Sequence, residues 1–306
     1  MKHAFTRRHW IGTTAAACAA AATAGDTSAA AAWSPSYLLS SALYGNAPLA
    51  DILPEVAKTG AASIDLWPRP HGGQREEVDT LGVDTVADLL KKHRVRLGGI
   101  ACYRPGAFKL ASEFDIVRRL GDANTVLVTM APGDGTLTGQ SLDEAIRRFL
   151  GRLEGSIGEA ERGGGVIAIE NHANSLLRSP ASIRRFAALV ESEHIGLALA
   201  PHHLPQEANL LADLAGDAGP SLKFVYAQQH GKGSSQQLPK DDELLQLPGR
   251  GPLDFGPLMK QLAQQHYTGP VEIFMHPVPR GVPILPTIAE ITAAVNQSRK
   301  YLDSLL

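Results

Sequence analysis

Short apolar segments rich in β-branched residues recur along the chain, and loops of glycine, proline and polar residues follow them. These segments cover residues 37–42, 62–66, 95–101, 125–130, 166–170, 195–200, 222–228 and 271–274. Each is continuously apolar instead of alternating with polar residues, which is typical of parallel strands buried on both faces. The pattern therefore predicts eight buried parallel strands.

Amphipathic helical patterns occupy the intervals between these segments. One helix has apolar residues at three- and four-residue spacing, at Leu142, Ile146, Phe149, Leu153 and Ile157. Helix starts are predicted by Ser141 with Glu144, by Ser179 with Pro180, and by Thr287 with Glu290. Eight strand–helix units predict a single (β/α)8 TIM barrel. An open doubly wound sheet is the alternative, but no glycine-rich phosphate turn follows the first strand.

The N-terminal residues 1–32 have a different pattern. The pair Arg7-Arg8 precedes an alanine-rich stretch at 11–24, which resembles a twin-arginine signal peptide. The stretch is too short and too weakly apolar for a stable membrane anchor. A disordered alanine-rich tail is the alternative interpretation. We expect residues 1–32 to engage the twin-arginine export machinery and residues 33–306 to form the barrel, giving an exported protein that is periplasmic or extracellular.

Composition narrows the class of protein only slightly. The 306 residues are 20% charged with a net charge of −2, so the chain resembles neither a disordered nor a collagen-like protein. This balance gives no electrostatic reason to expect a nucleic-acid partner. Beyond the signal region only Cys102 remains, which excludes an internal disulfide there; we expect a buried structural thiol.

Polar residues at the ends of the predicted strands are the candidates for chemistry, because catalytic residues of TIM barrels lie at that rim. Six histidines fall there: His71, His172, His202, His203, His230 and His276. Glu170 ends an apolar strand, where a carboxylate is costly to bury without a partner. The long loop 229–252 follows the seventh strand, and its Lys232 is a candidate substrate contact.

Four segments together resemble the xylose isomerase-like barrel superfamily, which includes sugar phosphate isomerases and epimerases. They are Ile-Glu-Asn-His at 169–172, the run at 196–204, Leu-Pro-Gly-Arg-Gly-Pro-Leu-Asp-Phe at 247–255, and the approach to the last strand at 267–272. The resemblance implies proton transfer through an enediol on a small carbohydrate, assisted by one divalent metal ion. Its implied ligands are Glu, Asp, His and Glu on strands five to eight.

This chain matches the implied ligand set only in part. Glu170 matches the first ligand, whereas Ala200 stands at the aspartate position. The histidine position falls on Tyr226, with Gln228 pointing the same way, and the last glutamate is Phe274 or, with a shift of two residues, Glu272. His203 matches a substrate contact of the family.

Three interpretations remain open at this point. A metal site for Zn, Mn or Mg is rebuilt from histidines; Glu170 and a histidine act without metal; or the barrel is a non-catalytic carbohydrate-binding protein in which Trp67, Tyr103 and Tyr226 stack on sugars. The predicted catalytic residues are Glu170, His203 and Glu272; the predicted substrate-binding residues are His71, His172, Tyr226, Gln228 and Lys232; and the predicted metal ligands are Glu170, His203, His230 and His276. The oligomeric state is not predicted.

Overall fold

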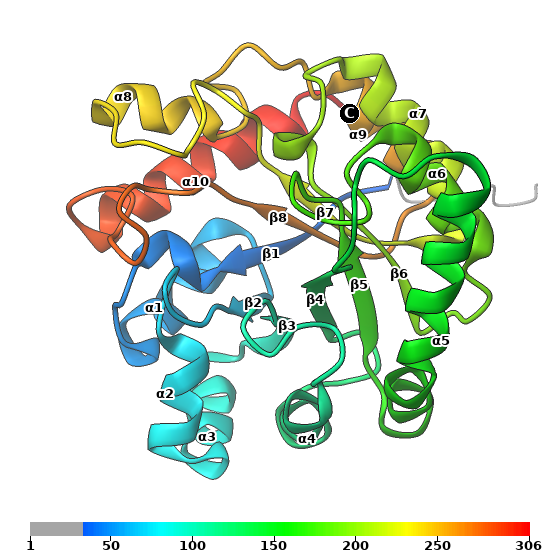
Figure 1. Ribbon diagram of the computed structural model, residues 1–306. Helices are drawn as coiled ribbons and strands as arrows, with labels where there is room; N and C mark the ends of the chain where they lie inside the picture. The colour runs from blue at the N-terminus through cyan, green and yellow to red at the C-terminus, as the bar shows by residue number, and fades with distance from the viewer. Residues whose placement is uncertain (1–32) are drawn as a thin grey trace, which may run out of the picture. The chain divides into compact units, whose positions relative to one another are not determined.

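The computed structural model describes residues 33–306, which fold into a closed barrel of eight parallel strands surrounded by helices (Figure 1). The strands are β1 (Ser36–Ser40), β2 (Ser63–Leu66), β3 (Arg96–Ala101), β4 (Val126–Met130), β5 (Val166–Glu170), β6 (Ile195–Leu199), β7 (Leu222–Ala227) and β8 (Pro270–Ile273). Each strand pairs with the next in sequence, and β8 pairs with β1 to close the barrel. The predicted single (β/α)8 barrel is confirmed.

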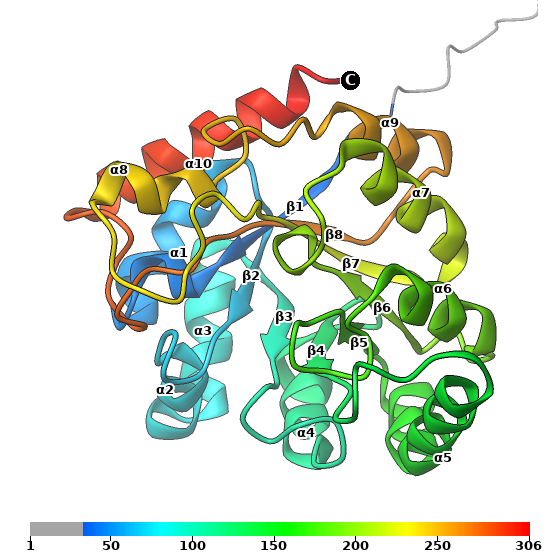
Figure 2. The same cartoon turned by 45° about the horizontal axis from the view of Figure 1, so that its top comes forward.

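The helices form an outer layer that covers the outward faces of the strands (Figure 2). They are α1 (Leu49–Val56), α2 (Gln74–Leu81), α3 (Val83–His93), α4 (Ala111–Leu120), α5 (Gly139–Gly163), α6 (Pro180–Leu189), α7 (Ala208–Ala218), α8 (Lys240–Glu243), α9 (Gly256–Gln264) and α10 (Ile288–Asp303). Short 3-10 helices occur at Ser41–Tyr44, Ala57–Thr59, Pro201–His203, Gly219–Ser221 and Leu244–Gln246. With apolar side chains on both sides, the strands are buried between this layer and the barrel interior.

Two of the three predicted helix starts are confirmed. Ser179 caps α6 with Pro180 at its first position, and Thr287 with Glu290 forms a capping box before α10. The third was wrong, because α5 begins at Gly139 and Ser141 already lies within the helix. Serine and glutamate three residues apart also occur together on the exposed face within a helix. This spacing therefore predicts the start of a helix only where the apolar pattern before it is interrupted.

The barrel interior has two distinct layers near the carboxyl ends of β2 and β8. Side chains two residues apart on a strand point to the same side. Trp67 and Phe274, just beyond the ends of these strands, stack with ring centroids 4.7 Å apart and 12° between planes. Asp65 and Glu272 lie one step deeper and are both completely buried. An aromatic layer therefore separates a pair of carboxyl groups from the rim of the barrel.

The loops after β1 and β8 are joined closely at this rim. Ile284 donates a backbone hydrogen bond of 3.0 Å to the carbonyl of Leu43. Gly45 adopts φ +59°, and a Cβ atom there would come within 2.6 Å of the Gly281 carbonyl oxygen. Only glycine tolerates both the positive φ and such a close contact with the Gly281 backbone. Gly45 therefore allows the loop after β8 to pack directly against the loop after β1.

Cys102 follows β3 and is fully buried, as expected for a structural thiol. Its Sγ donates to the carbonyl of Ile100 at 3.3 Å, and burial raises the pKa of the thiol well above its usual value. The predicted signal peptide, residues 1–32, lies outside the described residues. Within residues 33–306, none of the helices has the length and apolar character needed to cross a bilayer.

Candidate functional site

A cavity of about 130 Å³ opens at the carboxyl ends of the strands. Its lining consists of Trp67, His71, Tyr103, Met130, Glu170, His172, His203, Tyr226, Gln228, Phe274 and His276. Pockets for drug-sized ligands usually measure ~300–1,000 Å³, so this cavity suits a small substrate or the reacting end of a larger one. A larger hollow of about 600 Å³ lies at the opposite rim, where residues of TIM barrels serve stability instead of catalysis.

Glu170 and His203 form the acid–base pair of this cavity. Glu170 ends β5 and is only 6% exposed, and its Oε1 lies 3.6 Å from Nε2 of His203. Burial raises the pKa of Glu170 to about 8, although a hydrogen bond from Tyr103 lowers it in part. Burial, together with neighbouring histidines, lowers the pKa of His203 to about 2. Near neutral pH the pair therefore consists of a carboxylic acid beside a neutral imidazole.

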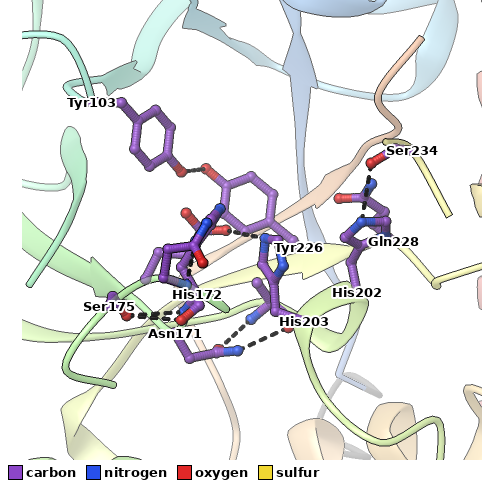
Figure 3. A network of polar contacts seen from close by, with 12 residues as sticks. Tyr103, Asn171, His172, Ser175, His202, His203, Tyr226, Gln228 and Ser234 are labelled. Carbon is purple, nitrogen blue, oxygen red and sulfur yellow. Dashed lines mark hydrogen bonds and ion pairs between the residues drawn. The ribbon is translucent and has the colours of Figure 1, made fainter. Parts of the chain in front are cut away.

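His172 stands next to this pair with a defined tautomer. Its ring lies beside that of His203 (Figure 3), with 4.0 Å between the ring centroids. The backbone N–H of Asn174 donates to Nδ1 of His172 at 3.2 Å, so the proton of the neutral ring sits on Nε2. Desolvation lowers the pKa of His172 and keeps it neutral. His172 is consequently a hydrogen-bond donor at the cavity.

The predicted gathering of histidines at one rim is present. His202 lies at the centre of the cluster, with ring centroids 5.0 Å from His203, 5.2 Å from His230 and 6.0 Å from His276. His276 continues to His71 at 5.1 Å. Burial lowers the pKa values of His71 and His202 to about 4, and it lowers that of His276 as well. His71, His202 and His276 are therefore uncharged near neutral pH.

Arg280 lies close to these histidines on the loop after β8. Its guanidinium donates to the carbonyl of Ser234 at 3.0 Å, which ties this loop to the loop after β7. Ser234 Oγ in turn lies 3.3 Å from Nε2 of His202. The positive charge of Arg280 contributes to the lowered pKa values of His71, His202 and His276. Sequence reasoning missed Arg280, because its loop has no motif.

Tyr103 and Tyr226 meet across the cavity with their hydroxyl oxygens 2.9 Å apart (Figure 3). Tyr103 follows β3 and Tyr226 belongs to β7, and these strands are on opposite sides of the barrel. The Tyr103 hydroxyl also lies near enough to the carboxyl group of Glu170 on β5 to affect its pKa. Oxygen groups from three strands therefore gather in the cavity.

Seven predicted site residues line the cavity: Glu170, His203, His71, His172, Tyr226, Gln228 and His276. Gln228 donates through Nε2 to Gln246 at 2.9 Å, which orients its amide group. The other three predicted residues lie elsewhere. Glu272 is in the deeper layer beside Asp65, and His230 packs behind His202. Lys232 is 58% exposed and pairs with Asp242 at 2.9 Å.

The cavity also contains residues that sequence reasoning did not assign to it. Met130 ends β4, a largely apolar strand, so nothing in the sequence distinguishes it from a core residue. Phe274 appears in the sequence only as a possible replacement for a metal ligand, yet its ring forms part of the cavity wall. Asp65 could have been found, because an aspartate inside a buried strand is costly without a partner.

The predicted histidine-rich metal site is not assembled. Among residues 33–306, no group of three or more His, Cys, Asp or Glu side chains is arranged to hold a metal ion. His230 is separated from Glu170 by the rings of His202 and His203, and His276 packs against Trp67 and Phe274 instead. The physical reason is that six histidines spread around a rim fill it by ring packing and do not converge on one point.

Comparison with known proteins agrees with this architecture. The sequence model of the xylose isomerase-like TIM barrel family matches residues 53–302. No curated relative matches the sequence. Among solved structures, a zinc-bound IolI protein has a TM-score of 0.67 at 16% identity, covering 88% of this chain and 99% of its own.

Two epimerase structures are similar to the same extent. D-psicose 3-epimerase from Clostridium cellulolyticum H10, bound to D-tagatose, has a TM-score of 0.63 at 14% identity, covering 89% of this chain and 99% of its own. The 3-keto-D-glucoside 4-epimerase YcjR from E. coli has a TM-score of 0.63 at 16% identity, covering 89% and 100%. At these identities the structures establish the fold alone. With the family match over residues 53–302, the chain belongs to the xylose isomerase-like TIM barrel family.

Proposed function

We propose that the protein is a sugar isomerase or epimerase that moves a proton next to the carbonyl group of a small carbohydrate. One observation carries this proposal: Glu170 and His203, 3.6 Å apart, are both in their neutral forms in a small buried cavity. The family membership and the epimerases of similar fold support the choice of a sugar substrate.

The geometry assigns complementary roles to the two groups. His203 accepts the proton from the substrate carbon, while Glu170 delivers its own proton to the carbonyl oxygen. Proton uptake by His203 alone is unfavourable in this site, because burial opposes its charge. Loss of the proton by Glu170 leaves a carboxylate 3.6 Å away that stabilises the imidazolium. The two transfers are therefore coupled, and the reverse transfers return the proton to carbon.

The metal ion implied by the family does not fit the residues of this cavity. Of the four implied ligand positions only Glu170 carries a carboxylate, and Ala200 offers a methyl group to the second. Just beyond β7 the Gln228 amide is hydrogen-bonded to Gln246, and just beyond β8 the ring of Phe274 stacks on Trp67. Hard divalent cations require several oxygen ligands, so no step of the mechanism is assigned to a metal.

The test is exchange of substrate hydrogen with solvent. Purified protein is incubated in D2O with D-psicose, D-tagatose, D-fructose, D-xylose and a 3-keto-glucoside, and proton NMR follows loss of the C–H signal beside the carbonyl. General acid–base groups contribute ~10²–10⁴-fold, so Glu170→Gln should slow exchange at least about 100-fold. The matched control is Glu154→Gln, on the exposed side of α5, which should exchange at the wild-type rate.

A non-catalytic carbohydrate-binding function is the second candidate, favoured by the aromatic wall of Trp67, Tyr103 and Phe274. Aromatic rings bind the apolar faces of sugars without any acid or base. If none of the sugars exchanges hydrogen, and calorimetry finds that they bind equally well to wild type and to Glu170→Gln, this second function replaces the first.

We propose in addition that residues 1–32 direct export through the twin-arginine pathway. The pair Arg7-Arg8 and the alanine-rich stretch that follows it support this. Replacement of both arginines by lysine preserves the charge and should leave the protein in the cytoplasmic fraction. Equal amounts of wild type and variant outside the cytoplasm would contradict the proposal.

A further inference from the structure

The cavity contains a hydrogen-bonded pair of tyrosines that the acid–base mechanism above does not use. Their hydroxyl oxygens are 2.9 Å apart, and both residues line the cavity beside Glu170. Within such a pair one hydroxyl donates to the other, and the second keeps a free O–H. Within the described part of the chain, their mutual contact at 2.9 Å is the one hydrogen bond that the structure gives either hydroxyl, so the pair has one spare donor facing the cavity.

The surroundings make this donor strong. The apolar side chains of Trp67, Met130 and Phe274 line the cavity together with the two tyrosines, and Tyr226 is buried. Hydrogen bonds in a buried site stabilise charge more than they do in water. Burial also raises the pKa values of both tyrosines, so the two hydroxyls stay protonated.

We propose that Tyr103 and Tyr226 are catalytic residues that bind the carbonyl oxygen of the substrate and stabilise the negative charge that develops on it. This inference rests on the proposed function and replaces the electrophilic role of a metal ion with hydroxyl donors. The pair spans the barrel from β3 to β7, so a carbonyl oxygen that enters the cavity meets it.

The protons of this step are transferred only between the substrate and the residues of the cavity. The C–H bond beside the carbonyl breaks and its proton goes to Nε2 of His203, while its electron pair forms the C=C bond of the enediol. The π electrons of the carbonyl move to oxygen, which accepts a hydrogen bond from the tyrosine pair and takes the proton of Glu170. This leaves a carboxylate beside the His203 imidazolium.

The test combines tyrosine variants with chelation. Wild type, Tyr103→Phe and Tyr226→Phe are dialysed against EDTA, and the exchange reaction above is measured over a range of substrate concentrations. Loss of one such donor costs ~10²–10³-fold in turnover, so each variant should lose about 100-fold in kcat with KM changed less than threefold. Tyr267→Phe is the matched control: it removes a buried hydroxyl, bonded to the Pro270 carbonyl at 3.1 Å, at the opposite rim.

Two results would overturn the inference while leaving the proposed function intact. One is that EDTA abolishes exchange in wild type and added Mn²⁺ or Zn²⁺ restores it. The other is that both tyrosine variants keep the wild-type kcat while Glu170→Gln is inactive.

A binding measurement separates failure of the inference from failure of the proposed function. Acetohydroxamate is a small planar mimic of an enediolate, and its affinity for EDTA-treated protein is measured by calorimetry. At least tenfold weaker binding to Tyr103→Phe and Tyr226→Phe, with unchanged binding to Tyr267→Phe, supports the tyrosine site even if none of the sugars exchanges hydrogen. Equal binding to all variants, or binding that requires added metal, contradicts it.

Discussion

The barrel contains two buried carboxyl sites that differ in access. Glu170 lies in the cavity, 3.6 Å from His203, and lines it together with Tyr103 and Tyr226. Asp65 and Glu272 lie one layer deeper, beneath the stacked rings of Trp67 and Phe274, where both are completely buried. Burial raises the pKa of Glu170 to about 8 and that of Asp65 to about 7, and it raises that of Glu272 as well.

The comparison shows that a protonated carboxyl group is not by itself a sign of catalysis. Asp65 and Glu272 are neighbouring buried carboxyl groups with raised pKa values, so they can share a proton, whereas none of their four oxygens bonds to any other group in residues 33–306 and Nε1 of Trp67 has no partner there either. That proton has no path to a ligand, because the Trp67–Phe274 layer lies between. The proton of Glu170 does face the cavity. The two sites therefore differ in depth: Asp65 and Glu272, one layer deeper in the barrel, are structural acids, whereas Glu170 at the cavity is a candidate catalytic acid.

The largest expected difference between the two sites is in turnover. Glu170→Gln should lower hydrogen exchange at least about 100-fold, because it removes a general acid. Glu272→Gln keeps the shape and a hydrogen-bonding partner for Asp65, so exchange should change less than about fivefold. An equal loss in both variants would show that Glu272 is catalytic, as the sequence alone suggested, and would break the comparison.

The second difference is in stability. Asp65→Ala leaves the Glu272 carboxyl without the one neighbouring carboxyl group with which it can share a proton, and none of the Glu272 oxygens bonds to any other group among the described residues. An unsatisfied buried polar group costs ~1–3 kcal/mol. Urea unfolding should therefore show a loss of about 1–3 kcal/mol. Asp65→Asn is the control, since the amide can still bond to Glu272 and should cost less. An Asp65→Ala variant as stable as wild type would mean that the pair contributes nothing to the fold.

The third prediction concerns pH. Asp65, Glu170 and Glu272 have pKa values raised by folding, so their stabilising contribution is complete below about pH 4 and is lost as pH rises toward 7–8. His71, His172, His202, His203 and His276 have lowered pKa values, so their contribution is lost as pH falls below about 6.5.

In the acid range the five histidines change stability more than the three carboxyl groups do, and of these eight groups only the carboxyl groups still titrate above pH 6.5. The free energy of unfolding should therefore peak near pH 6.5 and fall on both sides. Urea titrations at pH 5, 6.5 and 9 at constant ionic strength measure this, and Glu170→Gln should flatten the alkaline decline. Stability that rises steadily to pH 9 would contradict the assigned protonation of both carboxyl sites.

The smallest effect is expected outside both sites. Lys232 was a predicted substrate contact, but it is 58% exposed and pairs with Asp242 on the surface. Exposed ion pairs contribute ~0–1 kcal/mol, so Lys232→Ala should change stability by less than about 1 kcal/mol and leave KM for the sugar within twofold. A clear increase in KM would restore Lys232 to the site.

The barrel was predictable because its signal is local. Burial on both faces makes each strand apolar throughout, and β5 was predicted with the bounds observed, whereas β1 ends two residues earlier than expected. Glu170 was predictable for the same reason, as a carboxylate that ends such a run.

The rest of the site depends on relations between distant strands. Whether Glu272 or Phe274 reaches the cavity depends on the depth of β8 in the barrel, which its pairing with β1 and β7 determines. The hydrogen bond between Tyr103 and Tyr226 joins residues that no sequence motif connects. No pattern along one strand contains this information.

Cys102 gives the barrel a built-in reporter of its own opening. Its thiol is enclosed behind β3 and is almost never ionised while the fold is intact. A disulfide reagent can therefore label it only during excursions in which the strand separates from its neighbours, and the labelling rate measures how often these occur. In a Cys18→Ser chain Cys102 is the only thiol, and its labelling rate with and without bound sugar would show whether the sugar reduces transient opening of the barrel.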